Sequence, residues 1–148
     1  MTRHALVLDT NIVLDLFVFV DDAAHALRAG LVQRQVRWLA TSAMRDELVR
    51  VLGYPQIAAR LAARELQAQQ VLDEFDRHAE VVDAPGKAPI TCGDADDQKF
   101  IDLAISHGAC ILSKDFEVLR MKKRLQALAA DAMANWTAPL SADHHELA

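Results

Sequence analysis

Short apolar runs alternate with longer amphipathic stretches along this chain, and the alternation predicts its secondary structure. Short apolar runs that are bounded by polar residues or glycine are typical of strands covered on both faces. They predict strands at 4–8, 36–40, 80–82 and 109–112, with a fifth strand near 135–137.

Amphipathic stretches between and after these runs predict four helices. Their apolar residues recur at the spacing that places them on one helix face. The helices are expected at 42–53, 61–79, 96–108 and 117–133, with Ser42 capping the first and Asp96 or Asp97 the third. Strands that alternate with helices form parallel sheets joined by right-handed crossovers. We therefore expect an α/β fold, a three-layer α/β/α sandwich around a mostly parallel sheet.

The length of the chain indicates one domain. At 148 residues there is room for one hydrophobic core, and a hydrophobic fraction of 52% is ample to fill it. We expect the domain to span 1–140 and the segment 141–148, which contains His144 and His145, to be a flexible tail. Two prolines and two glycines within 83–95 predict a loop inside the domain.

Charge and composition narrow the possible functions. A net charge of −5 argues against a protein whose whole surface grips nucleic acid. An aromatic content of 5% gives no evident platform for stacking the bases of a single strand. The charge argument weakens where carboxylates gather at one place and are neutralised there by cations.

The apolar runs and the cysteines predict a cytoplasmic protein without a membrane anchor. The run 5–8 ends at Asp9 instead of continuing as a secretory signal, and the run 12–20 is too short to span a bilayer. Cys92 and Cys110 lack the close spacing of a zinc site, and two cysteines make no disulfide framework.

Four acids that are far apart in the sequence are predicted to meet at one edge of the sheet. Asp9 follows the first strand, and Asp115 follows the fourth. Asp97 opens the helix that leads into the fourth strand, and Glu47 lies just over one turn into the helix after the second. Open parallel sheets bind ligands at the carboxyl ends of their strands. Clustered carboxylates raise one another's pKa, and a hard divalent cation removes that repulsion. The cluster therefore predicts metal-assisted phosphoryl chemistry.

Each acid also has a purely structural interpretation. Asp97 and Asp115 are ordinary helix caps in many proteins, and Glu47 on a helix is commonly a solvated charge. Asp9 is different, because an acid directly after a buried apolar strand needs a partner. The evidence is the edge that the four acids share.

Taken together, these segments resemble the PIN-domain family of metal-dependent nucleases. The segment Leu6–Ile12 is similar to the opening strand of that family with its first acid, Asp9. The second acid of the family falls on Glu47, the third on Asp97, and the fourth on Asp115, 18 residues after the third. The resemblance extends from about His4 to Pro139 and implies that all four acids are catalytic and bind one or two Mg²⁺ or Mn²⁺ ions.

The stretch Asp96–Phe100 is most like the members of the family that are toxins of toxin–antitoxin pairs, the VapC-like ribonucleases. That resemblance implies cleavage of single-stranded or structured RNA, inhibition by a cognate antitoxin protein that blocks the site, and a homodimer. Ser113 stands where the family commonly has threonine, and it keeps the hydroxyl group. Asp97 is preferred as the third acid because Phe100 and Ala104 then fall on the buried helix face.

Several neighbouring residues are expected to assist. We expect Asn11 and Ser113 to orient the ligands or the scissile phosphate, and Asp94 and Asp96 to cap the helix or support the ligands. Substrate phosphates would be bound by basic residues near the acids, namely Lys114, Arg45 and Arg50. The basic run 120–124 is either part of this surface or an ordinary solvated helix face.

Two other functions stay open. Phosphoryl-transfer enzymes with an aspartyl nucleophile often carry a second Asp two residues after the first, and here that position is Asn11. A non-catalytic PIN-like module that binds RNA or a protein is the other alternative, and the presence of all four acids disfavours it. Metal-dependent hydrolysis does not use the 2′-hydroxyl, so the acids alone leave RNA and DNA open as substrates.

Overall fold

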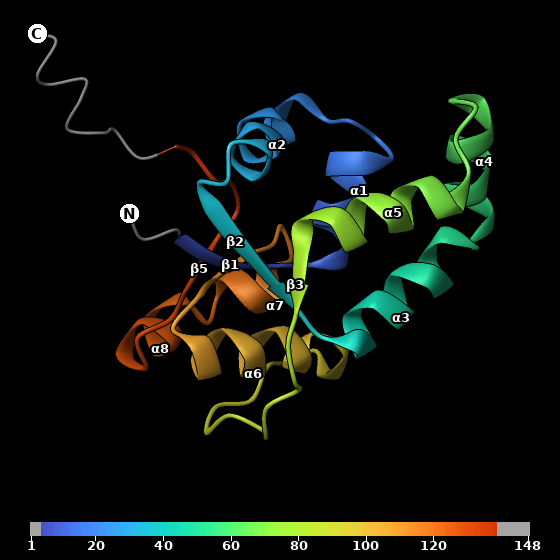
Figure 1. Cartoon of the computed structure of the whole chain (residues 1–148). Helices are drawn as coiled ribbons and strands as arrows, with labels where there is room; N and C mark the ends of the chain where they lie inside the picture. Colours follow the sequence, from blue (N-terminus) through green and yellow to red (C-terminus); the bar gives the residue numbers. More distant parts are fainter. Residues whose placement is uncertain (1–3, 139–148) are drawn as a thin grey trace, which may run out of the picture.

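Five parallel strands form a sheet at the centre of the molecule (Figure 1). The computed structural model describes residues 4–138, so the predicted tail 141–148 with His144 and His145 lies outside the described residues. The strands lie in the order β3-β2-β1-β4-β5. They are β1 (His4–Leu8), β2 (Val36–Ala40), β3 (Ala79–Val81), β4 (Cys110–Leu112) and β5 (Asp131–Met133).

Helices cover both faces of this sheet. In Figure 1, α1, α2 and α5 lie on one side of the strands, and α6 and α8 lie on the other. The helices of the described part are α1 (Thr10–Phe17), α2 (His25–Val32), α3 (Ser42–Leu52), α4 (Pro55–Ala63), α5 (Ala68–His78), α6 (Gln98–His107), α7 (Phe116–Leu119) and α8 (Lys122–Ala127). Short 3-10 turns at Asp22–Ala24 and Ala95–Asp97 precede α2 and α6. The predicted α/β sandwich is therefore confirmed.

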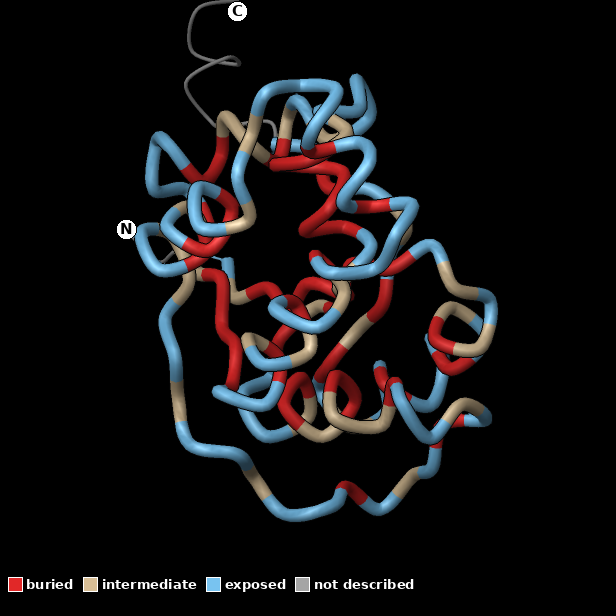
Figure 2. The backbone as a smooth tube through the Cα atoms, turned by 90° about the vertical axis from the view of Figure 1, so that its right-hand side faces the viewer, coloured by how far each residue is buried: buried red, intermediate tan, exposed pale blue. Residues whose placement is uncertain are grey.

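The central strand β1 is held in place by burial. Leu6, Val7 and Leu8 are at most 3% exposed, and β1 pairs with β2 on one side and β4 on the other. Trp38 of β2 packs edge-on against Phe75 of α5, with ring centroids 4.9 Å apart. Each fully buried side chain of this size contributes about 1.5–3 kcal/mol to folding. Figure 2 shows the molecule from the right-hand side of Figure 1, with the buried stretches of backbone mostly toward the interior and exposed stretches around them.

The predicted helix at 117–133 and the predicted strand at 135–137 are wrong. The helical segment is divided into α7 and α8 and stops at Ala127, and Ala129 adopts a left-handed φ of 64°. The chain then forms β5, in which Ala132 pairs with Ile111 of β4. Alanine-rich sequence favours helix locally. Pairing with β4 and the burial of Ala132 to 1% exposure override that preference.

The predicted helix at 61–79 corresponds to α5 and to only the last three residues of α4, most of which lies before the predicted start. Glu65, with a left-handed φ of 56°, separates them. Gln67 begins α5 with a capping box, in which its side chain and that of Gln70 each bond to the backbone of the other residue. The hydrophobic pattern also missed α1 and α2. In α1 every residue from Ile12 to Phe17 is buried, so no polar face marks the helical period.

The two helices that carry predicted site residues are close to their predicted bounds. Helix α6 begins at Gln98 and ends at His107, and Gly108 caps it with a left-handed φ of 61° that favours glycine. Helix α3 is capped by Thr41 rather than by Ser42, since the Thr41 hydroxyl accepts the backbone N–H of Met44 at 3.4 Å.

Candidate metal centre

The topology of the sheet creates a crevice at the carboxyl ends of β1 and β4. From β1 the chain continues to β2 on one side, whereas β4 lies on the other, and ligands bind where the strand order reverses in this way. Asp9 follows β1, and its backbone N–H donates to Leu112 of β4 at 3.0 Å. Ser113 follows β4, and its backbone N–H donates to Met133 of β5 at 3.0 Å. The ladder of hydrogen bonds therefore fixes both residues at the rim.

Ser113 connects two of the predicted acids. Its hydroxyl donates to Oδ2 of Asp9 at 2.7 Å and accepts the backbone N–H of Asp115 at 3.0 Å. The residue is fully buried. A buried hydroxyl whose donor and acceptor are both used holds its neighbours in a defined geometry. The structure thus places Ser113 as the residue that orients Asp9 relative to Asp115.

Three carboxylates meet beside this bridge. One oxygen each of Asp94, Asp97 and Asp115 lies within 4.8 Å of the others, a spacing at which three acids could share a metal ion. Asp97 is buried, and its Oδ2 has no hydrogen-bond partner among the described residues. Asp94 caps the turn before α6 by accepting the N–H of Asp96, and Asp115 caps α7 by accepting the N–H of Glu117, each at 2.9 Å. Capping fixes these two carboxylates without supplying a cation.

The electrostatics of the cluster are unfavourable without a cation. Burial raises the pKa of Asp97 to about 7, with contributions from a hydrogen bond to Asp115 and from the charges of Asp9, Asp115 and Asp94. Burial also raises the pKa of Asp9, and the hydrogen bond from Ser113 opposes that rise. None of the ion pairs between residues 4 and 138 includes any of the acids of this cluster, which are Asp9, Asp94, Asp97 and Asp115.

A hard divalent cation fits this donor set. All the converging groups are carboxylates, and oxygen ligands suit Mg²⁺ and Mn²⁺, whereas zinc and copper sites use imidazole or thiolate. The cation would supply the positive charge that the protein does not, and it would give the orphaned oxygen of Asp97 a partner. Asp94, predicted to be a cap or a supporting residue, is both a cap and a member of the close group.

Glu47 reaches the same rim but is already paired. Its Oε1 accepts the ammonium group of Lys99 at 2.8 Å, and its Oε2 accepts the hydroxyl of Thr10. The charge of Glu47 is close enough to raise the pKa of Asp9. The structure therefore brings the fourth predicted acid to the site, with both of its oxygens engaged by neighbouring side chains.

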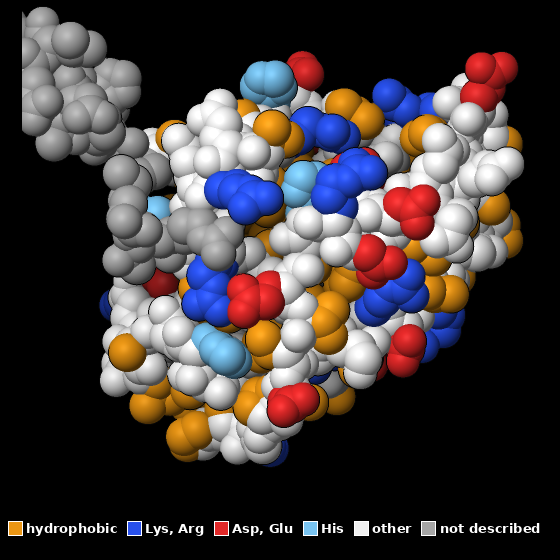
Figure 3. Space-filling view, viewed as in Figure 1, with side chains coloured by type: hydrophobic (Ala, Val, Ile, Leu, Met, Phe, Trp, Pro, Cys, Tyr) orange, Lys and Arg blue, Asp and Glu red, His pale blue; other side chains and the backbone are white. Residues whose placement is uncertain are grey.

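The predicted substrate contacts are placed less favourably. Arg45 forms two hydrogen bonds to Asp76 of α5, at 2.8 and 2.9 Å, and Lys114 pairs with Asp15 of α1 at 2.5 Å. Arg50 is exposed on α3. On the face shown in Figure 3, acidic and basic side chains stand next to one another at several places. Arg45 and Lys114 must leave these ion pairs before they can bind a phosphate.

The supporting residues Asn11 and Asp96 act through their backbones. The backbone N–H of Asn11 lowers the pKa of Asp9, while its side chain is on an exposed position of α1. The side chain of Asp96 is also exposed, and the backbone carbonyl of this residue accepts a hydrogen bond from the ammonium group of Lys99.

The predicted loop at 83–95 is confirmed, and side chains of α6 attach it to the domain. Gln98 accepts the backbone N–H of Cys92 at 2.7 Å and donates to the carbonyl of Ile90 at 3.1 Å. Asp102 accepts the backbone N–H of Ala88 at 2.9 Å. These contacts hold the end of the loop, and Asp94 with it, beside the start of α6.

Sequence reasoning missed four other residues at the rim. Thr10 and Lys99 hold Glu47, and their only signal was adjacency to predicted acids. Gly93 lies under the carboxylate of Glu117, because a Cβ at Gly93 would stand 1.9 Å from Oε2 of Glu117. Phe116, next to Asp115, is 69% exposed, and an exposed aromatic cannot be recognised from composition.

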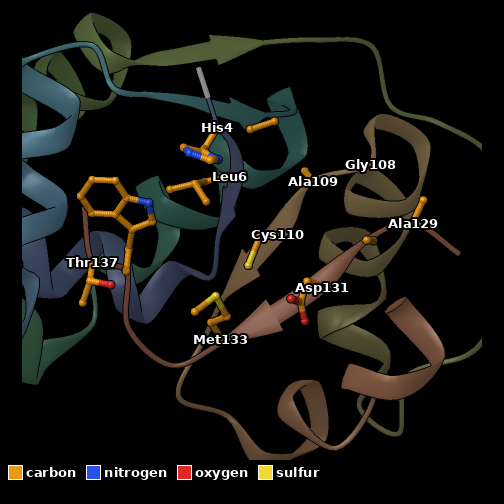
Figure 4. A pocket seen from close by; sticks show the side chains of 12 residues that line it. His4, Leu6, Gly108, Ala109, Cys110, Ala129, Asp131, Met133 and Thr137 are labelled. Atoms are coloured by element: carbon orange, nitrogen blue, oxygen red, sulfur yellow. The ribbon is translucent and has the colours of Figure 1, made fainter. Parts of the chain in front are cut away.

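The cavity in Figure 4 lies at the opposite end of the sheet. Its volume is about 350 Å³, and it is lined by the first residues of three strands, among them His4, Cys110 and Asp131. It contains none of the predicted acids. This cavity and the clustered charge thus lie at different ends of the sheet, and the charge is the better guide to chemistry because buried carboxylates without a cation need a ligand.

Comparison with known proteins identifies the family. A family model described as PIN domain matches residues 5–117, a range that contains all four predicted acids. No curated protein matches the chain. Between residues 4 and 138, no helix is both long enough and apolar enough to cross a membrane. Because the family model covers well over half of the chain, the protein belongs to the PIN domain family, whose members are generally nucleases.

Proposed function

We propose that this protein is a metal-dependent endoribonuclease that cleaves single-stranded RNA with Mg²⁺ or Mn²⁺. One observation carries the proposal: Asp97 is buried among other acids, and one of its oxygens has no partner within the described residues. A structural acid in such a position would have a cation or a set of donors. If the site binds a divalent ion, the absence of a cation and of hydrogen-bond donors at this oxygen of Asp97 is explained.

Asp9, Asp97 and Asp115 would hold the ion, with Asp94 beside them. When bound, the ion lowers the pKa of a water molecule and neutralises charge on the scissile phosphate. Ser113 keeps Asp9 and Asp115 in register through its two hydrogen bonds. Among residues 4–138, no histidine belongs to this cluster as a candidate general base. Cleavage is expected to leave a 3′-hydroxyl and a 5′-phosphate.

An exposed aromatic side chain favours single-stranded substrate. Phe116 follows Asp115 directly and is 69% exposed, although the chain has few aromatic residues. The guanidinium of Arg120 lies 5.7 Å from the centroid of its ring. Bases of a single strand stack on such rings, whereas bases in a duplex are stacked on one another. A base next to the scissile phosphate could therefore rest on Phe116.

We also propose that the protein is the toxin of a toxin–antitoxin pair, acting in the cytoplasm as a homodimer. The support is the resemblance of Asp96–Phe100 to such toxins. A cognate antitoxin would act by covering the acidic rim. Growth arrest on expression, relieved by the product of the neighbouring reading frame, is the expected result. Normal growth at a high level of folded protein would contradict the toxin role without affecting the nuclease proposal.

Digestion of a defined set of nucleic acids tests the nuclease activity. Transfer RNA, ribosomal RNA, a synthetic single-stranded RNA and the matching DNA are incubated with Mn²⁺ or with EDTA. Cleavage of RNA that requires Mn²⁺ and disappears in Asp97→Asn supports the proposal. Products with 2′,3′-cyclic phosphate ends would indicate a contaminating metal-independent ribonuclease. RNA binding without turnover would favour the non-catalytic alternative, and a trapped phospho-aspartate would favour phosphoryl transfer.

A further inference from the structure

Lys99 is the one basic side chain among residues 4–138 that is paired with a predicted acid of the site. Its ammonium group lies 2.8 Å from Oε1 of Glu47 and donates to the backbone carbonyl of Asp96. The same group stands 4.8 Å from the centroid of the Phe100 ring. Three contacts on different sides therefore fix the position of this charge.

The pair between Lys99 and Glu47 is more than a surface contact. The two side chains are 27% and 16% exposed, so water screens their attraction less than it does for pairs on the open surface. The second oxygen of Glu47 accepts the hydroxyl of Thr10. A metal ion bound to Glu47 would have to share this carboxylate with both neighbours, and the ammonium group would then stand next to a like charge.

The two sides of the site therefore differ in charge. Around Asp97, carboxylates gather without a cation from the described residues. At Glu47 the negative charge is already balanced by Lys99. In nucleases with two metal ions, the ions lie about 3.5–4 Å apart and stabilise the attacking and leaving oxygens together. Here a lysine occupies the side where a second ion would need Glu47 as its ligand.

We propose that Lys99 is the second cation of the active centre. One divalent ion is held by Asp9, Asp97 and Asp115, and the ammonium group of Lys99 replaces a second ion beside Glu47. An ammonium group has three N–H donors, and two of them serve Glu47 and Asp96. The third binds a phosphate oxygen of the substrate. Glu47 is then a positioning residue for Lys99 rather than a metal ligand. The substrate contact rests on the proposed nuclease function, whereas the ion count does not.

Counting bound Mn²⁺ tests the proposal without any need for activity. The free ion is measured by electron paramagnetic resonance during titration of the wild-type protein, Asp97→Asn, Glu47→Gln and Lys99→Met. Wild type is expected to bind one ion per chain. Asp97→Asn weakens binding by roughly tenfold or more, because it removes a ligand. Glu47→Gln changes the affinity by no more than about threefold, because the variant loses a neighbouring charge but no ligand of the ion.

Lys99→Met gives the opposite result, because it leaves Glu47 without its cation. This variant is expected to bind a second Mn²⁺ ion or to bind the first at least about threefold more tightly. The double variant Glu47→Gln/Lys99→Met returns to one ion with wild-type affinity. Lys123→Met, on the exposed surface of α8, is the matched control and should behave as wild type.

Three results would overturn the proposal. They are two ions in wild type, a loss of affinity in Glu47→Gln as large as in Asp97→Asn, and unchanged Mn²⁺ binding in Lys99→Met. Melting curves without metal establish that each variant folds, and methionine keeps the unbranched stem of the lysine side chain as far as Cε and lacks only the ammonium group.

RNA cleavage at a Mn²⁺ concentration that loads only one ion per chain tests the substrate contact. Lys99→Met is expected to lower kcat by roughly 100-fold, as loss of one charge-stabilising donor does, and Lys99→Arg should recover part of it. An equal kcat in wild type and Lys99→Met would contradict the contact. If wild type cleaves no RNA at all, the proposed function fails, and the Mn²⁺ counts still decide whether Lys99 replaces an ion.

Discussion

The two ends of the sheet surround an acidic side chain with different neighbours. At the amino end, Asp131 begins β5 and accepts the ammonium group of Lys122 and the N–H of Ala132, each at 2.8 Å. Burial raises its pKa, but these hydrogen bonds outweigh that effect and the pKa is lowered. At the carboxyl end, Asp97 has no such cation, and its pKa rises to about 7.

The difference shows which acids belong to the fold and which to the function. Asp131 and Glu47 each form an ion pair with a lysine. Within the described part of the chain, no ion pair includes Asp9, Asp97 or Asp115. Repulsion that the fold tolerates at one place is expected to be relieved by a ligand that binds there.

Exchanging the two acids for amides should separate the two ends most clearly. Asp97→Asn is expected to lower Mn²⁺-dependent RNA cleavage by roughly 1,000-fold, because it removes a ligand of the metal. Its melting temperature without metal should not fall, because the substitution removes a source of repulsion. Asp131→Asn should keep its activity and lose about 1 kcal/mol of stability or less, since the pair with Lys122 is partly exposed. Equal loss of activity in both variants would remove the distinction.

Substitutions at Ser113 test whether activity requires the hydrogen bonds that hold Asp9 next to Asp115 at the carboxyl end of the sheet. Ser113→Ala removes the bridge between Asp9 and the N–H of Asp115, so cleavage should fall about 10- to 100-fold. Stability should fall by about 1–3 kcal/mol because a buried N–H loses its partner. Ser113→Thr keeps the hydroxyl and serves as the control, with activity within a few fold of wild type. Activity and metal affinity unchanged in Ser113→Ala would show that Asp9 needs no alignment.

Phe116 tests whether the carboxyl end also recognises a base. Phe116→Ala should weaken the binding of single-stranded RNA by roughly 5- to 20-fold, which corresponds to the lower half of the about 1–3 kcal/mol that stacking on one base contributes. Phe116→Trp should bind at least as well as wild type. Tyr54→Ala, at an exposed aromatic outside the acidic cluster, is the control. Binding is measured by fluorescence anisotropy in Ca²⁺, and equal affinities of Phe116→Ala and wild type would count against stacking.

The smallest expected effect is a dependence of stability on pH. An unfolded Asp ionises near pH 4, whereas folded Asp97 keeps its proton to about pH 7. Between these values the unfolded state binds fewer protons, so the metal-free protein should become less stable as the pH rises from 4 to 7 and then level off. The decrease is expected to be about 1–2 kcal/mol after screening, and it should be smaller in Asp97→Asn, which keeps only the contribution of the raised pKa of Asp9. Melting temperatures between pH 5 and 8 measure it, and a rise over this range would contradict the assigned direction.

The strands and the positions of the acids could be predicted from the sequence, because both depend on local pattern. β1 and β2 have the predicted bounds, and an acid directly after β1 must lie at its carboxyl end. β5 was missed because its sequence favours a helix, and only pairing with β4 makes it a strand. The ion pair between Glu47 and Lys99 was missed for a similar reason. Lys99 is 52 residues away in the chain, and no local pattern records that the two side chains meet.

The most direct test of the central claim is an anomalous difference map from crystals of the wild-type protein soaked in Mn²⁺. The account predicts one strong peak between the carboxylates of Asp9, Asp97 and Asp115, and no peak at Asp131. Absence of a peak at the carboxyl end, in crystals where that rim is open to solvent, would contradict it.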